Sequence, residues 1–389
     1  MKIIHTSDWH LGHTLYDHDR TEEQLDMLGQ MSGLVSDIQP DLFLLCGDVF
    51  HVSQPSAAIQ TVFAEALLAL HEACPEMTIV ITAGNHDSPS RHEVFKRPWK
   101  SMNVHMIGSL SRECPEDHII EIPGKGFAAA VPYCNERNLP DGFYQNLLDI
   151  IAERNHEGLP VVMSAHTTVS GCDASGHDRA SDFSVGGIDG VNISEFGSGY
   201  DYLALGHIHK PQFIGGDGKV RYCGTPLPVS FDETYGHSVT IVELDAHGAA
   251  PRTDTVEIGN LRPVVTLPSE GFATWDEAKG LLAAFPDNLK AYVRLNVAVE
   301  DFLPPDAFAE AVQLAEDKAC RFCCINTRRL VETGSGAKEM SVSEFREESP
   351  LKIAERYAAD NGIEFDEELQ MIFGEVLKII EEESREQYN

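Results

Sequence analysis

Five stretches of the chain share one pattern, in which a run of apolar residues is followed directly by side chains that bind metal ions. These stretches are residues 3–10, 43–48, 79–87, 161–166 and 202–209. Each apolar run has the length and the aliphatic content of a buried strand. In open α/β sheets, ligands bind beyond the carboxyl ends of the strands. We therefore expect an α/β fold in which the five strand ends converge on one site.

The side chains at these strand ends are carboxylates, imidazoles and one amide. They are Asp8, His10, Asp48, Asn85, His86, Asp87, His166, His207 and His209. Oxygen and imidazole ligands without a thiolate favour manganese, iron or zinc. Two such cations about 3.5–4 Å apart clamp a phosphate and lower the pKa of a bound water toward about 7. A single histidine of this kind is usually an ordinary core or surface residue, but five motifs in this order predict a dimetal centre.

The 389 residues exceed what one hydrophobic core usually serves, so further domains are expected. Strands and helices alternate up to about residue 250, and residues 246–262 are rich in Gly, Pro and polar residues without any of the motifs. We therefore place a first domain at residues 1–255. Strands expected at 263–267, 291–299 and 324–331 alternate with helices expected at 275–285 and 305–317. This order predicts a small α+β domain over residues 256–336.

The remaining residues, 337–389, are acidic and have the periodicity of helices. The last helix carries an apolar stripe of Leu369, Ile372, Phe373, Val376, Leu377 and Ile380. Such a stripe packs onto its own chain or docks a partner helix. The residues by themselves leave both alternatives open.

The net charge of −33 limits how this chain can bind a polyanion. Proteins that bind nucleic acid by themselves usually carry a basic surface. Metal ions, a local basic strip or a partner protein must therefore hold such a substrate. One basic strip is present, with Arg91, Lys96, Arg97 and Lys100 against the single acidic residue Glu93. Contacts of this kind position DNA without reading its sequence; a solvated helix face is the alternative.

Cysteine usage and hydropathy indicate a cytoplasmic protein. Nine cysteines without the spacing of a disulfide framework are typical of a reducing compartment. Cys320, Cys323 and Cys324 resemble half of a zinc site, but no second pair completes it, so we expect buried thiols. No apolar stretch reaches the roughly 20 residues of a membrane span, and we expect no membrane association. Met1 and Lys2 lead straight into a short strand, which leaves no room for a signal peptide.

The order Asp-x-His, Gly-Asp, Gly-Asn-His-Asp, His and Gly-His-x-His resembles that of the calcineurin-like metallophosphoesterases. The residues around the ligands, at 6–12, 47–51, 205–212 and 222–231, are similar to signatures of the SbcD family, the nuclease subunits of SbcCD DNA-repair complexes. Thr225 stands where that family often has Ser. The match covers residues 1 to about 245, and the smaller domain only by size and position. The resemblance implies an αββα sandwich of two mixed β-sheets flanked by helices, with a small α+β capping domain and a C-terminal helical arm.

The resemblance also implies a role for each residue of the centre. One metal ion is expected on Asp8, His10, Asp48 and His209, and the other on Asp48, Asn85, His166 and His207, with manganese as the expected metal. His86 is expected to face the departing 3′ oxygen as a proton donor or charge stabiliser. Asp87 is expected to orient a ring of the cluster, as carboxylates do for metal-binding histidines. His51 is expected near His86, although a plain loop histidine is the alternative.

The implied activity is that of a dimetal-dependent DNA nuclease, both a 3′→5′ exonuclease on double strands and an endonuclease on single strands and hairpins. The implied partners are DNA and an SbcC-type SMC-like ATPase, docked through residues 337–389, with a homodimer inside a heterotetramer. A phosphoprotein phosphatase, nucleotidase or cyclic-nucleotide phosphodiesterase is the alternative enzyme. Phosphoprotein phosphatases typically have Glu at the position of Asp87, and Asp-Arg in place of Phe50 and His51. A non-catalytic scaffold would lack metal ligands, and each expected ligand is present.

Overall fold

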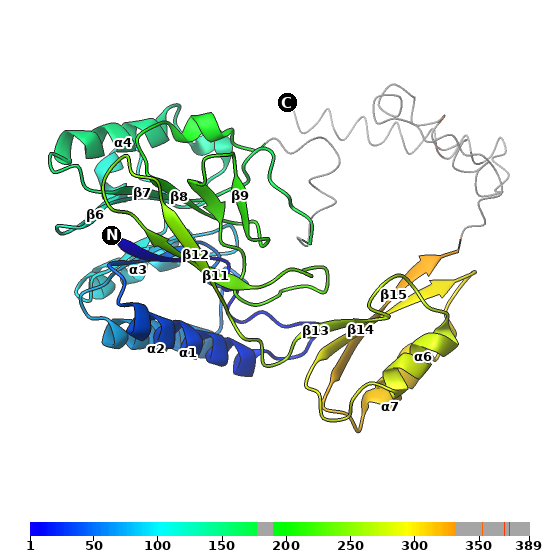
Figure 1. Cartoon of the computed structure of the whole chain (residues 1–389). Coiled ribbons are helices and arrows are strands. Elements are labelled where there is room, and N and C mark those ends of the chain that lie inside the picture. The colour runs from blue at the N-terminus through cyan, green and yellow to red at the C-terminus, as the bar shows by residue number, and fades with distance from the viewer. Residues whose placement is uncertain (177–189, 331–351, 353–368, 370–372, 374–389) are drawn as a thin grey trace. The chain divides into compact units, whose positions relative to one another are not determined.

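The structure is a computed structural model that describes residues 1–176, 190–330 and the single residues Lys352, Leu369 and Phe373 (Figure 1). Met1–Arg329 form one unit and Leu330–Asn389 another. The helical arm expected at residues 337–389, with its apolar stripe, lies almost wholly outside the described residues and stays a prediction. Among the described helices, none is long and apolar enough to cross a membrane.

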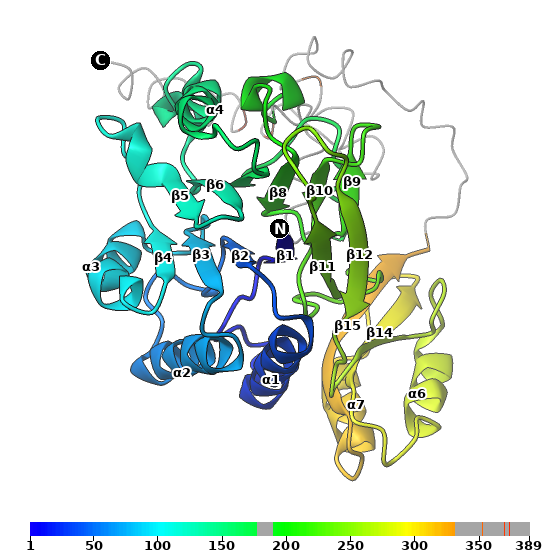
Figure 2. The same cartoon turned by 60° about the vertical axis from the view of Figure 1, so that its left-hand side comes forward.

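The first sheet contains the three strands that precede the first three motifs. Its strand order is β12-β11-β1-β2-β3-β4 (Figure 2). The strands are β1 (Lys2–Thr6), β2 (Leu42–Cys46), β3 (Thr78–Thr82), β4 (Val104–Ile107), β11 (Ser238–Glu243) and β12 (Arg252–Glu257). Strands β1 to β4 pair in parallel, and β11 pairs antiparallel with both β1 and β12. The parallel strands are buried on both faces, which is why their sequences are continuous apolar runs.

The second sheet contains the strands that precede the last two motifs. Its order is β5-β6-β7-β8-β10-β9. The strands are β5 (Ile119–Ile122), β6 (Gly126–Val131), β7 (Val161–His166), β8 (Tyr202–Gly206), β9 (Gln212–Ile214) and β10 (Val220–Tyr222). Strands β6, β7, β8 and β10 pair in parallel, and the edge strands β5 and β9 are antiparallel to their neighbours.

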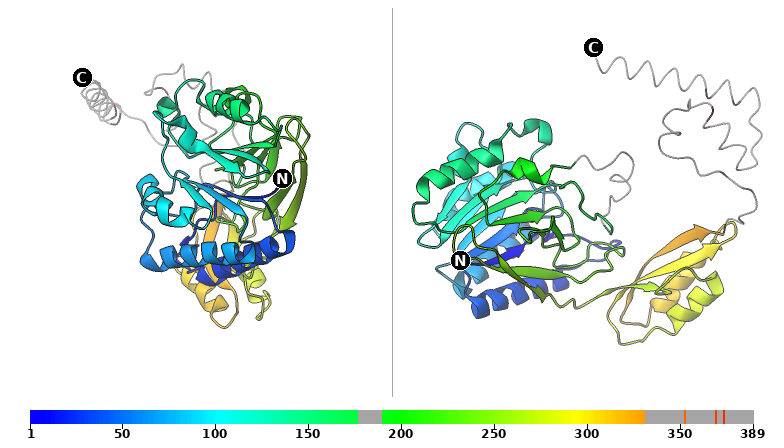
Figure 3. Two further views of the ribbon diagram at one scale, coloured as in Figure 1. Left: turned by 90° about the vertical axis from the view of Figure 1, so that its left-hand side faces the viewer. Right: turned by 45° about the horizontal axis from the view of Figure 1, so that its top comes forward.

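The two sheets pack face to face between two layers of helices. Residues such as Leu44, Val80, Val162 and Ala204 form the core between the sheets. The helices of this part are α1 (Thr21–Ile38), α2 (Ala57–Ala73), α3 (Pro89–Lys100) and α4 (Phe143–Arg154), with short 3₁₀ turns at Pro115–His118, Glu136–Asn138 and Ile193–Phe196. Helices α1 and α2 share a core with the first sheet and α4 shares one with the second (Figure 3). This arrangement confirms the expected αββα sandwich.

The small domain follows the expected order of elements closely. It consists of β13 (Val264–Leu267), α6 (Trp275–Ala283), β14 (Tyr292–Val299), α7 (Ala307–Ala315) and β15 (Arg321–Arg329). All three strands pair in parallel in the order β13-β14-β15, so each connection crosses over through a helix. Thr274 and Glu277 form a capping box at the start of α6. The domain has its own buried core of residues from both helices and the sheet.

One strand lies where the sequence predicts a boundary. The stretch 246–262 contains β12, which extends the first sheet at its edge. All of its side chains are exposed or half-buried, and three of them, Arg252, Asp254 and Glu257, are charged. An edge strand of this kind has no apolar run to reveal it, which is why its sequence resembles that of a linker.

The close packing of the two sheets gives a first prediction. A Cβ on Gly206 would lie 1.8 Å from the carbonyl oxygen of Cys46 and 2.9 Å from Nδ1 of His166. We expect Gly206→Ala to lower the free energy of unfolding by about 3 kcal/mol or more, measured by urea denaturation, because backbone must move to relieve the clash. Gly216→Ala meets nothing within 4 Å and is expected to change stability by no more than about 0.5 kcal/mol. Equal stabilities of the two variants would contradict the packing.

Candidate metal centre

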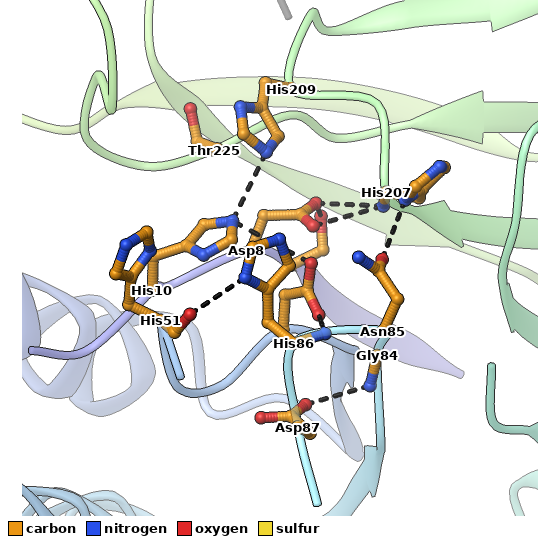
Figure 4. A network of polar contacts seen from close by, with 12 residues as sticks. Asp8, His10, His51, Gly84, Asn85, His86, Asp87, His207, His209 and Thr225 are labelled. Carbon is orange, nitrogen blue, oxygen red and sulfur yellow. Dashed lines mark hydrogen bonds and ion pairs between the residues drawn. The ribbon is translucent and has the colours of Figure 1, made fainter. Parts of the chain in front are cut away.

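The carboxyl ends of five strands meet at one place, as the sequence predicted (Figure 4). Strands β1, β2 and β3 of the first sheet and β7 and β8 of the second supply the residues. These are Asp8, His10, Asp48, Asn85, His86, Asp87, His166, His207 and His209. Most of them are buried, whereas Asn85 is exposed and His86 and His207 are half-buried. The centre is therefore open on the side of these last three residues.

The first potential metal group consists of Asp8, His10 and His209, whose ligand atoms lie within 4.8 Å of one another. Nε2 of His10 is 3.3 Å from Nε2 of His209 and 3.9 Å from Oδ2 of Asp48. Burial lowers the pKa of His10 well below its ordinary value, which favours the neutral ring that binds metals. Two imidazole nitrogens this close repel unless a proton or cation lies between them. The donor set therefore fits a divalent cation.

The second potential group consists of Asp48, His166 and His207, with Asn85 beside it. Nδ1 of His166 donates to the carbonyl of Cys46 at 2.8 Å, so Nε2 of that ring faces the centre. It lies 3.0 Å from Oδ1 of Asn85 and 3.4 Å from Oδ2 of Asp48. Burial disfavours a charged ring here, but Asp48 outweighs it and raises the pKa of His166 to about 9. Positive charge is favoured at this position, where a divalent cation competes with the proton.

Asp48 belongs to the second group and also lies beside His10 of the first. Its Oδ2 faces His10 and His166, and its Oδ1 accepts the backbone N–H of His86 at 2.8 Å. Burial opposes its ionisation, but His166 and His10 hold the pKa of Asp48 well below its ordinary value. A permanently charged carboxylate between two ligand groups fits the expected bridging position. The geometry thus brings together both ligand sets that the sequence analysis implied.

Four of the expected ligands have positive φ angles, which residues other than glycine rarely adopt. The φ angles are 53° at Asp8, 46° at His10, 50° at Asp48 and 95° at His207. Each such residue costs on the order of 1–3 kcal/mol, and strain of this kind gathers at functional sites. Backbone bonds between the loops maintain it: the N–H of Asp8 donates to Gly47, and that of His10 to Asp48, both at 3.0 Å. The orientation of these side chains therefore depends on a strained backbone that hydrogen bonds between the loops hold in place.

His86 and His51 lie beside the first group. Nδ1 of His86 donates to the carbonyl of His51 at 2.8 Å, and the two rings stack with their centres 5.6 Å apart. The ring of His86 meets that of His10 edge-on at 5.0 Å. Because Nδ1 is bound to backbone, Nε2 of His86 is the nitrogen available to a substrate. His51 lies beside His86, as expected, and the role of His86 toward a leaving group stays a prediction.

Asp87 differs from its expected role. Its carboxylate accepts the backbone N–H groups of Gly84, Val49 and Phe50 at 2.9, 3.1 and 3.0 Å. It also lies 3.7 Å from the ring of His92 on α3. Asp87 therefore fixes the loop after β3 to the loop after β2, and these contacts within the described part of the chain do not include a ring of either metal group.

Residues outside the strand ends also contact expected residues of the centre, directly or through His51. Oε1 of Glu233 accepts a hydrogen bond from Nδ1 of His209 at 2.9 Å, and Nδ1 of His13 lies 3.2 Å from the guanidinium of the buried Arg20. The rings of His13 and His51 are 4.6 Å apart. Glu233, His13 and Arg20 were not expected from the sequence, because none of them directly follows an apolar strand.

The basic strip and the cysteines can be placed as well. Arg91, Arg97 and Lys100 are exposed on α3, which begins directly after the Asp87 loop, and Lys96 pairs with Glu93 at 3.6 Å. Their contact with DNA stays a prediction. Cys320 and Cys323 are buried and Cys324 is half-buried, and burial raises the pKa of all three thiols. Cys320 and Cys323 are thus buried, as expected, whereas Cys324 is partly accessible.

Known proteins resemble this chain over most of its length. The calcineurin-like phosphoesterase family matches residues 1–211. The SbcD component of nuclease SbcCD from Rhodobacter capsulatus is 32% identical over 327 residues, which cover 75% of this chain and 78% of that protein. The corresponding SbcD component from Bacillus subtilis is 31% identical over 329 residues, which cover 78% and 80%.

Among solved structures, a dimetal phosphatase from Danio rerio matches 66% of this chain and 98% of its own, with 12% identity and a TM-score of 0.37. The family match covers all the strand-end residues described above. The chain therefore belongs to the calcineurin-like phosphoesterase family and, within it, to the SbcD family.

Proposed function

We propose that this chain is a dimetal-dependent DNA nuclease and the catalytic subunit of an ATPase-coupled DNA repair complex. The observation that supports it most is the pair of ligand groups joined by Asp48, with His86 beside them, in a chain whose relatives are named nucleases. The proposed activities are 3′→5′ exonuclease cleavage of double strands and endonuclease cleavage of single strands and hairpins.

We propose the two ligand sets that the family resemblance implies, and the closeness of these side chains supports them. Asp8, His10, Asp48 and His209 would hold one divalent ion, and Asp48, Asn85, His166 and His207 the other. When bound, two such ions clamp a phosphate and lower the pKa of a bound water toward about 7. Oxygen and imidazole ligands are compatible with manganese, which we propose as the metal.

His86 is the residue that we propose acts on the leaving group. Its Nδ1–H is bound to the His51 carbonyl, so the ring keeps one orientation. Nε2 then faces the open side of the centre, where a protonated ring donates to the departing 3′ oxygen. His51 supports this arrangement through its carbonyl and through the stacked ring.

Partners would supply much of the grip on DNA. The relatives are named as one component of the nuclease SbcCD, which is a complex of more than one kind of chain. We propose that residues 337–389 dock an SbcC-type SMC-like ATPase and that the chain forms a homodimer inside a heterotetramer. This chain has a net charge of −33 and would by itself repel DNA. Binding of the DNA by the partner offsets this repulsion.

His86→Leu tests the proposed chemistry. Removing the imidazole while keeping the ligands is expected to lower Mn²⁺-dependent cleavage of end-labelled duplex DNA by about 10²–10⁴-fold, the usual contribution of an acid–base group. Calorimetric titration is expected to show both ions still bound. His156→Leu, at an exposed histidine in the loop after α4, is the control. Unchanged cleavage by His86→Leu would refute the role of His86.

Arg97→Glu tests the basic strip. Loss of a phosphate contact weakens DNA binding and lowers the slope of log affinity against log salt by about 1. Fluorescence anisotropy at several KCl concentrations, in the His86→Leu background, measures both quantities. Arg328→Glu makes the same charge change at an exposed position of β15. A slope equal to that of this control would exclude the strip from the DNA site.

Truncation after Gly336 tests the docking segment. We expect the truncated chain to lose co-purification with the ATPase, because the proposed apolar stripe is gone. Hydrolysis of a small p-nitrophenyl phosphodiester is expected to continue, because Met1–Arg329 form a unit that contains the whole centre. Co-purification that survives the truncation would place the partner elsewhere.

A further inference from the structure

Glu233 is a buried carboxylate that reaches the metal centre from outside the strand-end loops. Its side chain is almost fully buried, and its Oε1 accepts a hydrogen bond from Nδ1 of His209 at 2.9 Å. With the proton on Nδ1, the Nε2 atom of His209 faces Nε2 of His10 at 3.3 Å. A carboxylate in this position fixes the ring and makes the imidazole a stronger ligand.

The second oxygen of Glu233 is fixed as well. Oε2 accepts a hydrogen bond from the hydroxyl of Thr225 at 3.1 Å. The backbone N–H of Thr225 in turn donates to the carbonyl of His209 at 3.1 Å, and Figure 4 shows the two residues side by side. The carbonyl of Thr225 accepts a hydrogen bond from Nδ1 of His237 at 3.0 Å. Both carboxylate oxygens therefore have partners, and the orientation of His209 depends on where Glu233 sits.

A residue of the small domain holds the loop just before Glu233. The guanidinium of Arg294, on β14, donates to Oδ1 of Asp232 at 2.7 Å and lies 3.5 Å from the carbonyl of Phe231. It also lies 5.2 Å from the centre of the Phe231 ring. Phe231 belongs to a buried cluster with Leu15, Tyr292 and Cys323. The two residues before Glu233 are thereby attached to the sheet of the small domain.

We propose that Glu233 is a positioning residue for His209 and that the small domain sets its position through Arg294. The inference rests on the dimetal centre of the proposed function and deepens it, because it gives the small domain control over one of the two ions. A displacement of β14 pulls on Asp232 and Phe231, moves Glu233 and turns His209 away from His10. Affinity falls for the ion of the Asp8, His10 and His209 group, whereas His166 and Asn85 keep their positions.

Metal binding by full-length variants tests the inference without relying on nuclease activity. In a calorimetric Mn²⁺ titration, Glu233→Ala is expected to lower the affinity for one of the two ions by about 10–100-fold and to leave the affinity for the other unchanged. Glu233→Gln keeps an oxygen that accepts from Nδ1, so it is expected to restore most of this affinity. Arg294→Ala is expected to lower the affinity for the same ion. Arg328→Ala, which removes a guanidinium over Phe272 in the same domain, is expected to leave both ions unchanged.

The outcomes separate the two parts of the inference. Wild-type affinity for both ions in Glu233→Ala overturns the positioning role, and so does equal weakening of both ions. Wild-type affinity in Arg294→Ala overturns control by the small domain. If Glu233→Ala does not fold, as judged by circular dichroism, Glu233→Asp carries the test, because its shorter side chain gives the same expected loss. A wild-type protein that binds both ions but cleaves no DNA contradicts the proposed function alone.

Discussion

The hydrogen bond from Nδ1 of His166 to the carbonyl of Cys46 joins the two sheets at the metal centre. It ties the end of β7 to the end of β2 at 2.8 Å, and by fixing the proton on Nδ1 it decides which nitrogen faces Asp48. The approach is so close that a Cβ on Gly47 would lie 2.1 Å from the same Nδ1 atom. The position of the His166 ring beside Asp48 thus follows from backbone packing between the sheets. Glycine at positions 47 and 206 is a requirement of this packing and not a matter of loop flexibility.

The convergence of the expected ligands could be predicted from the sequence, because each of them lies at or within four residues of the end of an apolar strand. Local pattern and the rule for strand ends together place such residues without any knowledge of tertiary contacts. Glu233 has no such signal: its contact with His209 arises only when a loop after β10 folds back over the end of β8. Asp87 lies inside a motif, but the motif did not reveal its partners. A histidine ring was expected, and the carboxylate instead accepts three backbone N–H groups.

The buried parts of the fold could be predicted from the sequence better than its edges. Buried parallel strands are visible as apolar runs, whereas the edge strand β12 buries little and resembles a linker. In the small domain the order of elements was predictable from periodicity, but the parallel pairing of β13, β14 and β15 depends on both helices crossing the same sheet. Pairing direction is a property of the packed domain and cannot be obtained from the order of elements alone.

The two ligand groups differ in what supports them. His10 begins a loop that leads to Leu15, which packs on the small domain, and to Asp19, whose carbonyl accepts a bond from Arg321 at 2.8 Å. His209 reaches the same domain through Glu233. His166 and Asn85 instead lie on the facing ends of β7 and β3, at the joint between the sheets. Because small shifts between packed domains cost less than shifts within a sheet core, the first group is the adjustable half of the centre and the second is the fixed half.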